Sequence, residues 1–275
     1  MISEAPEAGF LRRIESHCLT LCLANWQDAN GPMRLNRGLS GKDLRKASFF
    51  QNTRRFLVAL QEQGGTEATA TGNLNRVFVR HMFECMTLPP LIRETMIRIN
   101  KVFNENDLWD LHRVRVVSEL AGLVRRRSRH FKLTKKGTAL LADDRAGELY
   151  YTLFVAYFRE FDLHYDFNFR DVPGIQKTMA VILWRIDDAL TEWLPVEGLA
   201  PRILLPKVLD QIRNAMVSEH DREEWILSGY VLEPLYRFGL IEKRVESDWP
   251  RIDEKDAVRI TPLWKKFISF RPFGW

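Results

Sequence analysis

Residues 120–137 read LAGLVRRRSRHFKLTKKG, and this stretch decides the expected fold. Apolar residues at helical spacing precede it from about Asn106, so a helix should end near Gly122. The next apolar residues predict two short strands around an arginine-rich turn at 125–129, and Thr134 can cap a short helix after them. The order helix, strand, turn, strand, helix is typical of the C-terminal part of a winged helix-turn-helix.

A second copy of this pattern lies near the C-terminus, after a helix predicted from about Asp221. Phe238-Gly239-Leu240-Ile241 aligns with residues 120–124, and Ile260-Thr261 aligns with Leu133-Thr134. The segment between the two predicted strands is longer in this copy and more polar. Two alignable segments of this kind predict repeated modules.

A third, looser match lies near the N-terminus and consists of Leu57 to Leu60, Gly64-Gly65, Thr69 and Gly72. The aligned threonines then fall at 69, 134 and 261, with separations of 65 and 127 residues. These separations are close to one and two lengths of a single unit, so we expect a degenerate third copy here.

These patterns predict a mainly α (α+β) protein with tandem winged-helix-like modules, short two-stranded wings and an intervening helical layer. Wide apolar faces at 146–163 and 174–192 predict two buried helices in that layer. The expected parts are an N-terminal helical module with the degenerate winged-helix unit (1–88), a winged-helix-like module (89–145), the connecting helical layer (146–200) and a C-terminal winged-helix-like module (201–275).

The charge of the 275-residue chain is divided unevenly between its two halves. Residues 1–140 hold 23 Lys and Arg against 13 Asp and Glu, a net of +10, and the rest of the chain carries −5. Three cysteines are too few to staple a secreted domain, which favours a reducing cytoplasm. No apolar stretch approaches the length of about 20 residues that a membrane helix needs, and the N-terminus does not read as a secretory signal. We therefore expect a cytoplasmic protein without membrane association.

The strongest candidate site is the expected wing, because residues 125–136 carry seven positive charges and no acidic residue. Side chains of this kind on a hairpin can contact phosphates and give salt-sensitive, sequence-independent affinity for nucleic acid. The preceding helix at 107–121 would then be the recognition helix, with His112, Arg113, Val116 and Glu119 on its outward face. The predicted nucleic-acid-binding residues are Arg113, Arg125, Arg126, Arg127, Arg129, Lys132, Lys135 and Lys136.

Two alternatives to this interpretation stay open at the level of sequence. The arginines of the wing can instead pair with acidic residues of the C-terminal half, and no arginine is then available to bind phosphate. The second expected wing, residues 242–256, holds six acids against four bases and should repel phosphate, so that copy better suits packing, dimerisation or a protein partner. Further apolar residues are Trp249 and those of the C-terminal tail: Phe267, Ile268, Phe270, Phe273 and Trp275. They are expected to dock on the body of the protein or to complete a dimer interface.

Three segments carry a resemblance to a known group of proteins: residues 69–74, residues 131–137, and Glu148 to Tyr150 followed by Phe154 and Phe158. They resemble a region of uncharacterised bacterial proteins that attach it to a plasmid-encoded open-reading-frame-three type domain or to a zinc-binding SEC-C motif. The resemblance covers about residues 50–165 and implies no known activity. This chain has only three scattered cysteines, so the zinc site of the SEC-C motif is not carried over.

Metal binding and catalysis find little support in the sequence. His17, Cys18 and Cys22 share a helix face, but free buried cysteines are far commoner than an incomplete zinc site. Glu160, Asp162, His164, Asp166 and Asp171 alternate with apolar residues, as in an ordinary half-buried segment. Phosphate-loop, dinucleotide-binding, nucleophile-elbow and zinc-protease motifs are all missing. We expect no enzyme activity, no metal and no cofactor.

Two functions follow as hypotheses. The first is a nucleic-acid-binding or regulatory bacterial protein that contacts double-stranded DNA through the wing at 125–136 and the helix at 107–121. The second is a protein-interaction, scaffolding or dimerisation module that does not bind nucleic acid.

Overall fold

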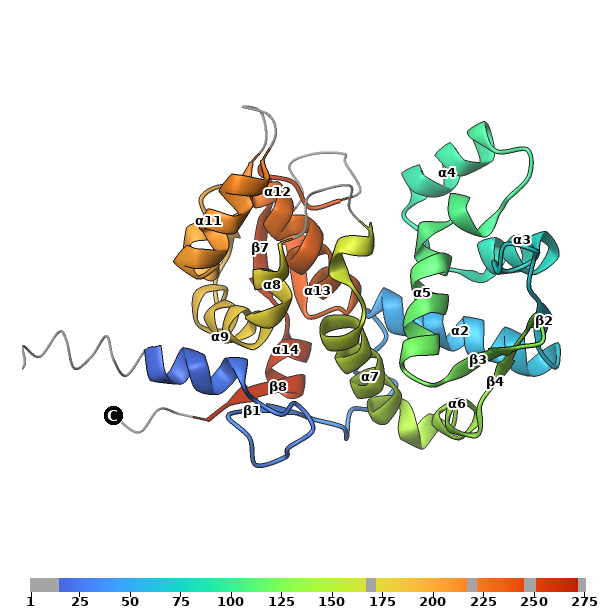
Figure 1. The fold of residues 1–275 in the computed structure, drawn as a ribbon, viewed down its shortest axis with the longest axis horizontal. Helices are drawn as coiled ribbons and strands as arrows, with labels where there is room; N and C mark the ends of the chain where they lie inside the picture. Colours follow the sequence, from blue (N-terminus) through green and yellow to red (C-terminus); the bar gives the residue numbers. More distant parts are fainter. Residues whose placement is uncertain (1–14, 167–171, 217–221, 245–250, 272–275) are drawn as a thin grey trace, which may run out of the picture.

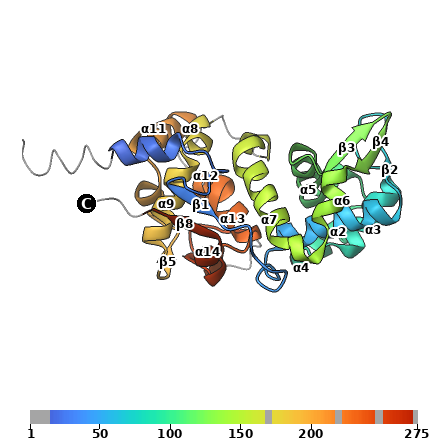
Figure 2. The ribbon, with the colours of Figure 1, turned by 90° about the horizontal axis from the view of Figure 1, so that it is seen from below.

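The computed structural model describes residues 15–166, 172–216, 222–244 and 251–271, which are mostly helical with three small sheets (Figure 1). The first described residues, 15–22, are helical and lie beside the C-terminal half of the chain. In both views the molecule is elongated, with one group of elements at each end and α7 (Ala146–Val155) between them (Figure 2). The mainly helical fold predicted from the sequence is confirmed.

One end of the molecule is built from the segment between Ser48 and Arg145 (Figure 1). Its elements are α2 (Ser48–Glu62), β2 (Thr66–Glu67), α3 (Arg76–Cys85), α4 (Pro90–Ile99), η1 (Glu105–Asp107), α5 (Trp109–Leu120), β3 (Val124–Arg127), β4 (His130–Leu133), α6 (Lys135–Leu140) and η2 (Asp143–Arg145). Local chemistry sets several of the boundaries. The Asn75 side chain accepts the backbone N–H of Phe78 at the start of α3, and Pro90 occupies the first turn of α4.

The other end begins with α8, at Pro173. Its elements are α8 (Pro173–Lys177), α9 (Met179–Ala189), β5 (Leu194–Pro195), α10 (Ala200–Ile203), α11 (Pro206–Ala215), α12 (Glu223–Leu227), η5 (Ser228–Leu232), α13 (Glu233–Arg237), β6 (Ile241–Arg244), β7 (Ala257–Ile260), α14 (Pro262–Phe267) and β8 (Ile268–Phe270). The strand β1 (Met33–Leu35) pairs antiparallel with β8 and ties the N-terminal segment to this end.

An aromatic core on α7 and the π-helical segment η3 (Ala156–Glu160) joins the two ends. Phe154 packs edge-on against Phe238 and Phe267, and the Tyr150 hydroxyl donates to the Phe238 carbonyl at 2.7 Å. The helices predicted at 146–163 and 174–192 are buried as expected from their wide apolar faces. Because these rings are fully desolvated, they supply much of the stabilisation that joins the two ends.

The two larger sheets have the same strand order relative to the chain. β2 pairs with β4, which pairs with β3, and in the C-terminal half β5 pairs with β7, which pairs with β6. Each sheet is therefore an antiparallel hairpin whose second strand also binds a two-residue strand from earlier in the chain.

The two segments that align in sequence also make the same hydrogen bonds. Thr134 Oγ1 donates to the carbonyls of Gly122 and Leu123 at 2.7 and 3.2 Å, and Thr261 Oγ1 donates to those of Gly239 and Leu240 at 2.7 and 3.2 Å. Both glycines have positive φ, 68° and 73°, as the residue after a helix often does. The sequence alignment of these two segments is thus matched by their geometry.

The expected third copy does not have this arrangement. Residues 66–67 form β2, the short strand that completes the sheet of the next hairpin. Thr69 lies in a turn and accepts the Asn73 backbone N–H on its hydroxyl at 3.1 Å. Thr69 therefore does not make the hydrogen bonds that Thr134 and Thr261 make to a glycine carbonyl. The expected boundary between residues 88 and 89 also separates β2 from its partner β4, so it divides one sheet.

The C-terminal tail docks on the body within the described residues. Phe267 and Ile268 are buried, and β8 continues from them against β1. Trp249, Phe273 and Trp275 lie outside the described residues. The structure therefore shows docking for Phe267 to Phe270.

Candidate nucleic-acid interface

The arginine-rich segment forms a tight antiparallel hairpin with Arg125 opposite Lys132 and Arg127 opposite His130. Ser128 and Arg129 connect the strands with φ of 48° and 60°, as a two-residue hairpin turn of this twist requires. Since side chains alternate across a strand, these four cross-strand residues share the face opposite the buried Phe131. The hairpin projects at the end of the molecule farthest from the C-terminus (Figures 1 and 2).

A short helix places two more cations beside the base of the hairpin. Thr134 caps α6 by accepting the Gly137 backbone N–H at 3.0 Å. A Cβ at Gly137 would lie 2.1 Å from the Leu123 carbonyl oxygen, so glycine allows the helix to approach the first strand. Lys135 and Lys136 are thereby held in the first turn of α6.

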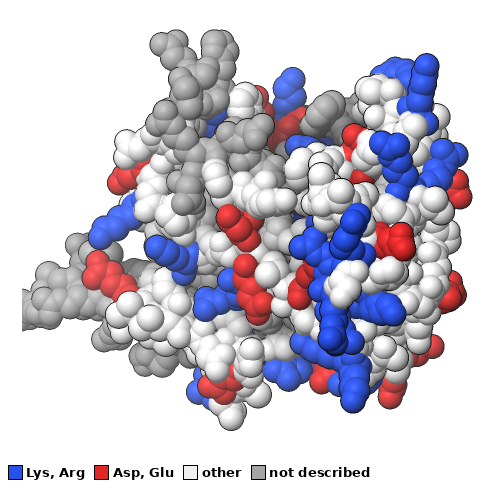
Figure 3. Space-filling view, turned by 45° about the vertical axis from the view of Figure 1, so that its right-hand side comes forward, with Lys and Arg blue, Asp and Glu red and all other residues white. Residues whose placement is uncertain are grey.

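The seven basic residues of this surface are all exposed, and we call them the basic wing: Arg125, Arg126, Arg127, Arg129, Lys132, Lys135 and Lys136. Two of them bind backbone carbonyls, Arg126 Nη1 to Gly72 at 3.0 Å and Lys136 Nζ to Ala121 at 2.8 Å. Within the described ranges, no ion pair joins any of the seven to a carboxylate. Lys and Arg side chains form a column on the side of the molecule that Figure 3 brings forward, where β3 and β4 lie.

The predicted recognition helix is not part of this surface. His112 is buried, and Arg113, Val116 and Glu119 are each partly covered, so the prediction of an outward face is wrong. The Arg113 side chain is only 12% exposed and lies 3.4 Å from Asp110. The helix contacts α2, α3 and η3, which cover it on several sides. Arg113 is therefore removed from the set of candidate phosphate or base contacts.

A buried polar cluster, which sequence reasoning missed, fixes α5. Glu105 is 1% exposed, and its Oε1 lies 2.6 Å from both His112 Nδ1 and Arg115 Nε, while Oε2 accepts the Leu74 backbone N–H. Burial alone raises the pKa of Glu105, but the His112 hydrogen bond and the Arg115 charge outweigh burial and lower it. His112 Nε2 lies 3.1 Å from the Tyr165 hydroxyl on the other side. The polar side chains of α5 thus hold this helix in place inside the protein.

The second hairpin differs from the basic wing in how its charges are used. Lys243 lies 3.5 Å from the buried Asp256, and Arg259 donates to Glu242 at 2.6 Å. The guanidinium groups of Arg244 and Arg259 lie over the ring of Trp193 at 4.9 and 4.6 Å. Glu246 and Asp248 lie outside the described residues. Lys243, Arg244 and Arg259 of this hairpin are thus each engaged by an acid or by an aromatic ring, whereas no carboxylate in the described ranges pairs with a cation of the basic wing.

The candidate metal and catalytic residues do not converge. In the part of the chain that is described, no three His, Cys, Asp or Glu side chains are placed to hold a metal ion. Burial raises the pKa of the Cys18 and Cys22 thiols, which disfavours the thiolate form that binds metal. His164 Nδ1 lies 3.2 Å from the Tyr230 hydroxyl and takes part in packing against η5. Asp171 and the side chain of Asp166 lie outside the described residues.

Comparison with known proteins supplies one match. Residues 45–146 match the family described as the Y4jL N-terminal domain. The matched segment begins just before α2 and ends at the first residue of α7, so it contains the whole basic wing and the helices that support it. Its description names neither the plasmid open-reading-frame-three type domain nor the SEC-C motif. No curated protein and no solved structure matches the chain. Among the described residues, no helix is both long and apolar enough to cross a membrane.

Proposed function

We propose that this protein binds nucleic acid through the basic wing, by contacts to backbone phosphates. The observation that carries the proposal is the absence, in the described ranges, of carboxylate partners for seven exposed cations. An ion-paired arginine must lose its partner before it meets a phosphate, whereas these arginines need only release water and counterions. Double-stranded DNA is the ligand that we expect.

The proposal includes a fold assignment for both units. Each unit has a first helix, a short strand, further helices and then a hairpin, and the short strand pairs with the second strand of the hairpin. This order is typical of a winged helix-turn-helix. We interpret the segment from α2 to β4 and the segment from α9 to β7 as two such modules. In the first module, the hairpin β3–β4 is the wing, and α4 is an additional helix between the second and third helices of the motif.

The binding that we propose does not depend on base sequence. In a winged helix, the third helix enters the major groove, and here that helix is α5, whose Arg113 and His112 are engaged inside the protein. Arginines on the wing can contact the phosphates of any duplex. We therefore expect similar affinities for mixed duplexes of unrelated sequence.

The test is a salt titration of binding to a fluorescently labelled mixed duplex, followed by anisotropy. Each cation that contacts a phosphate adds about −0.9 to the slope of log affinity against log salt, so the four wing arginines contribute about −3.6. Replacing Arg125, Arg126, Arg127 and Arg129 by alanine should make the slope shallower by about that amount. A matched control removes the same charge from exposed positions elsewhere, with Arg98, Lys101, Arg202 and Lys207 replaced by alanine. No binding at low salt, or equal losses in both variants, contradicts the proposal.

The second candidate function, binding of a protein partner, is favoured by a different surface. α4 buries only Met96, while Leu91, Ile97 and Ile99 are 42%, 60% and 68% exposed. Exposed apolar side chains grouped on one helix are typical of an interaction surface. Light scattering over a range of concentrations tests self-association, and replacing Ile97 and Ile99 by Ser should abolish any that occurs.

A further inference from the structure

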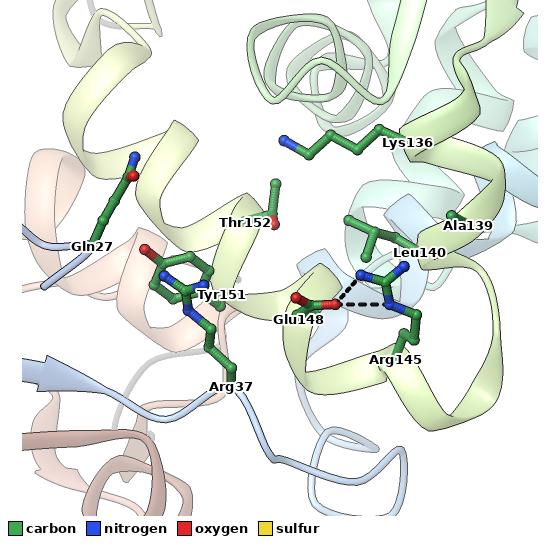
Figure 4. A pocket seen from close by; sticks show the side chains of 9 residues that line it. All are labelled: Gln27, Arg37, Lys136, Ala139, Leu140, Arg145, Glu148, Tyr151 and Thr152. Atoms are coloured by element: carbon green, nitrogen blue, oxygen red, sulfur yellow. Dashed lines mark hydrogen bonds and ion pairs between the residues drawn. The ribbon is translucent and has the colours of Figure 1, made fainter. Parts of the chain in front are cut away.

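A polar cleft of about 280 Å³ opens between α6, α7 and the loop after β1, next to the basic wing (Figure 4). It is lined by Gln27, Arg37, Lys136, Ala139, Leu140, Arg145, Glu148, Tyr151 and Thr152. Its volume equals that of about nine molecules of liquid water, which is enough for a phosphate group with part of its hydration shell. The lining combines three cations with a single carboxylate, so the cleft attracts anions.

Packing orients the cations before any ligand arrives. The Arg37 guanidinium lies over the ring of Tyr151 at 4.0 Å, as Figure 4 shows, and no described carboxylate is paired with it. Arg145 Nε donates to Glu148 at 2.7 Å, which holds that guanidinium at the edge of the cleft. Lys136 Nζ donates one proton to the Ala121 carbonyl and keeps two more for other acceptors.

A glycine brings Arg37 to this place. A Cβ at Gly147 would lie 2.3 Å from the Arg37 carbonyl oxygen and 2.5 Å from the Leu39 nitrogen. The first turn of α7 can therefore lie directly against the backbone of residues 37–39 only because residue 147 has no side chain. This contact places an arginine from the N-terminal segment opposite a lysine of the basic wing.

We propose that the cleft between α6 and α7 binds a phosphate group. This group can belong to the backbone of the nucleic acid that the basic wing binds, or to a free phosphate ester. The first source rests on the function proposed above, and the second does not. Lys136 belongs to both surfaces, so a backbone that follows the wing meets the cleft next. Arginine with its fork of donors and lysine as a point charge are the usual protein ligands of phosphate.

The free-ester source is tested by calorimetric titration of the full chain with inorganic phosphate and with a nucleoside monophosphate. We expect saturable binding that Arg37→Ala weakens about tenfold or more, because a hydrogen bond to a charged group is lost. Arg37 is exposed, so the variant should fold. Arg34→Ala, an exposed arginine on β1 outside the cleft, is the matched control and should leave affinity unchanged.

The backbone source is tested by the duplex salt titration. Arg37→Ala should reduce the slope by about 0.9 if a backbone phosphate occupies the cleft. The variant without the four wing arginines should keep its phosphate binding, because none of those residues lines the cleft. Duplex binding can thus fail while the cleft still binds a free ester. If phosphate does not bind and Arg37→Ala also leaves the duplex slope unchanged, or if phosphate binds equally to wild type and Arg37→Ala, the cleft proposal is overturned.

Discussion

Arg237 of α13 forms an ion pair with Asp110 of α5, and this contact joins the two helices that precede the two hairpins. The side chains are 24% and 16% exposed, so solvent screens the pair only in part. Asp110 also holds Arg113, which is the residue that the sequence predicted to face nucleic acid. The same carboxylate therefore ties α5 to α13 and engages the arginine that the sequence predicted to face nucleic acid.

The coupling between these two residues can be measured by a double-mutant cycle. Asp110→Ala and Arg237→Ala should each lower the free energy of unfolding. The loss in the double variant should be about 1–2 kcal/mol smaller than the sum of the two single losses. Urea unfolding followed by circular dichroism gives the free energies. Strictly additive losses would show that the ion pair contributes nothing to joining the helices.

Removing the charge of Glu105 should destabilise the protein by about 3 kcal/mol or more. Glu105→Gln keeps the shape of the side chain but removes the buried carboxylate between His112 and Arg115, and it leaves Arg115 with only the partly exposed Glu119 as an acidic partner. Glu62→Gln, at an exposed position of α2, is the control and should change stability by less than about 0.5 kcal/mol. Equal stabilities of the two variants in urea would mean that Glu105 is not the charge that holds Arg115.

A methyl group at Gly137 should separate α6 from β3. In Gly137→Ala, the new Cβ meets the Leu123 backbone, which cannot move aside as a flexible side chain could. We expect a loss of about 1–3 kcal/mol and a weaker affinity for duplex, because Lys135 and Lys136 shift with the helix. Gly41→Ala, where a Cβ meets no atom within 4 Å, should leave both properties unchanged. Thermal unfolding and anisotropy provide the two readouts.

Stability should fall in mild acid because of His17. Burial lowers the pKa of His17 from 6.5 to about 4, so below pH 6.5 the unfolded chain takes up a proton that the folded protein does not. The stabilisation is complete above pH 6.5 and is lost progressively as the pH falls toward 4. Between pH 7 and pH 5, the free energy of unfolding of His17→Gln should therefore fall by about 2 kcal/mol less than that of the wild type. Identical losses in the two proteins would contradict the shift.

The hairpin and its short helix follow from local sequence. The order of apolar and basic residues in 120–137, the glycine after the helix and the capping Thr134 act over a few residues, so their effects can be read without the rest of the chain. The same holds for the second copy ending at Thr261. The segment near Thr69 contains the same residue types without the same hydrogen bonds, because glycine and threonine occur in many kinds of turn.

The burial of α5 could not be read from its sequence. His112, Arg113, Arg115 and Glu119 make the helix as polar as an exposed one, and its apolar residues fill only part of its surface. Glu105 binds His112 and Arg115, and Asp110 binds Arg113. Two further partners are far away along the chain: Tyr165, whose hydroxyl lies 3.1 Å from His112 Nε2, and Arg237, which pairs with Asp110. A charged residue becomes buried when a distant residue satisfies it, and single-sequence patterns do not record that pairing.

The sequence by itself determined that this protein is mainly helical, that it has two hairpins of matching local structure, and that one of them concentrates positive charge. Only the tertiary structure decided which of the charges stay at the surface without a carboxylate, that α5 is largely buried, and that Arg37, Lys136 and Arg145 line one cleft. The reason is the range of the interactions. Hydrogen bonds of caps and turns join neighbours in the chain, whereas ion pairs and clefts depend on residues that only the packing of the whole molecule brings together.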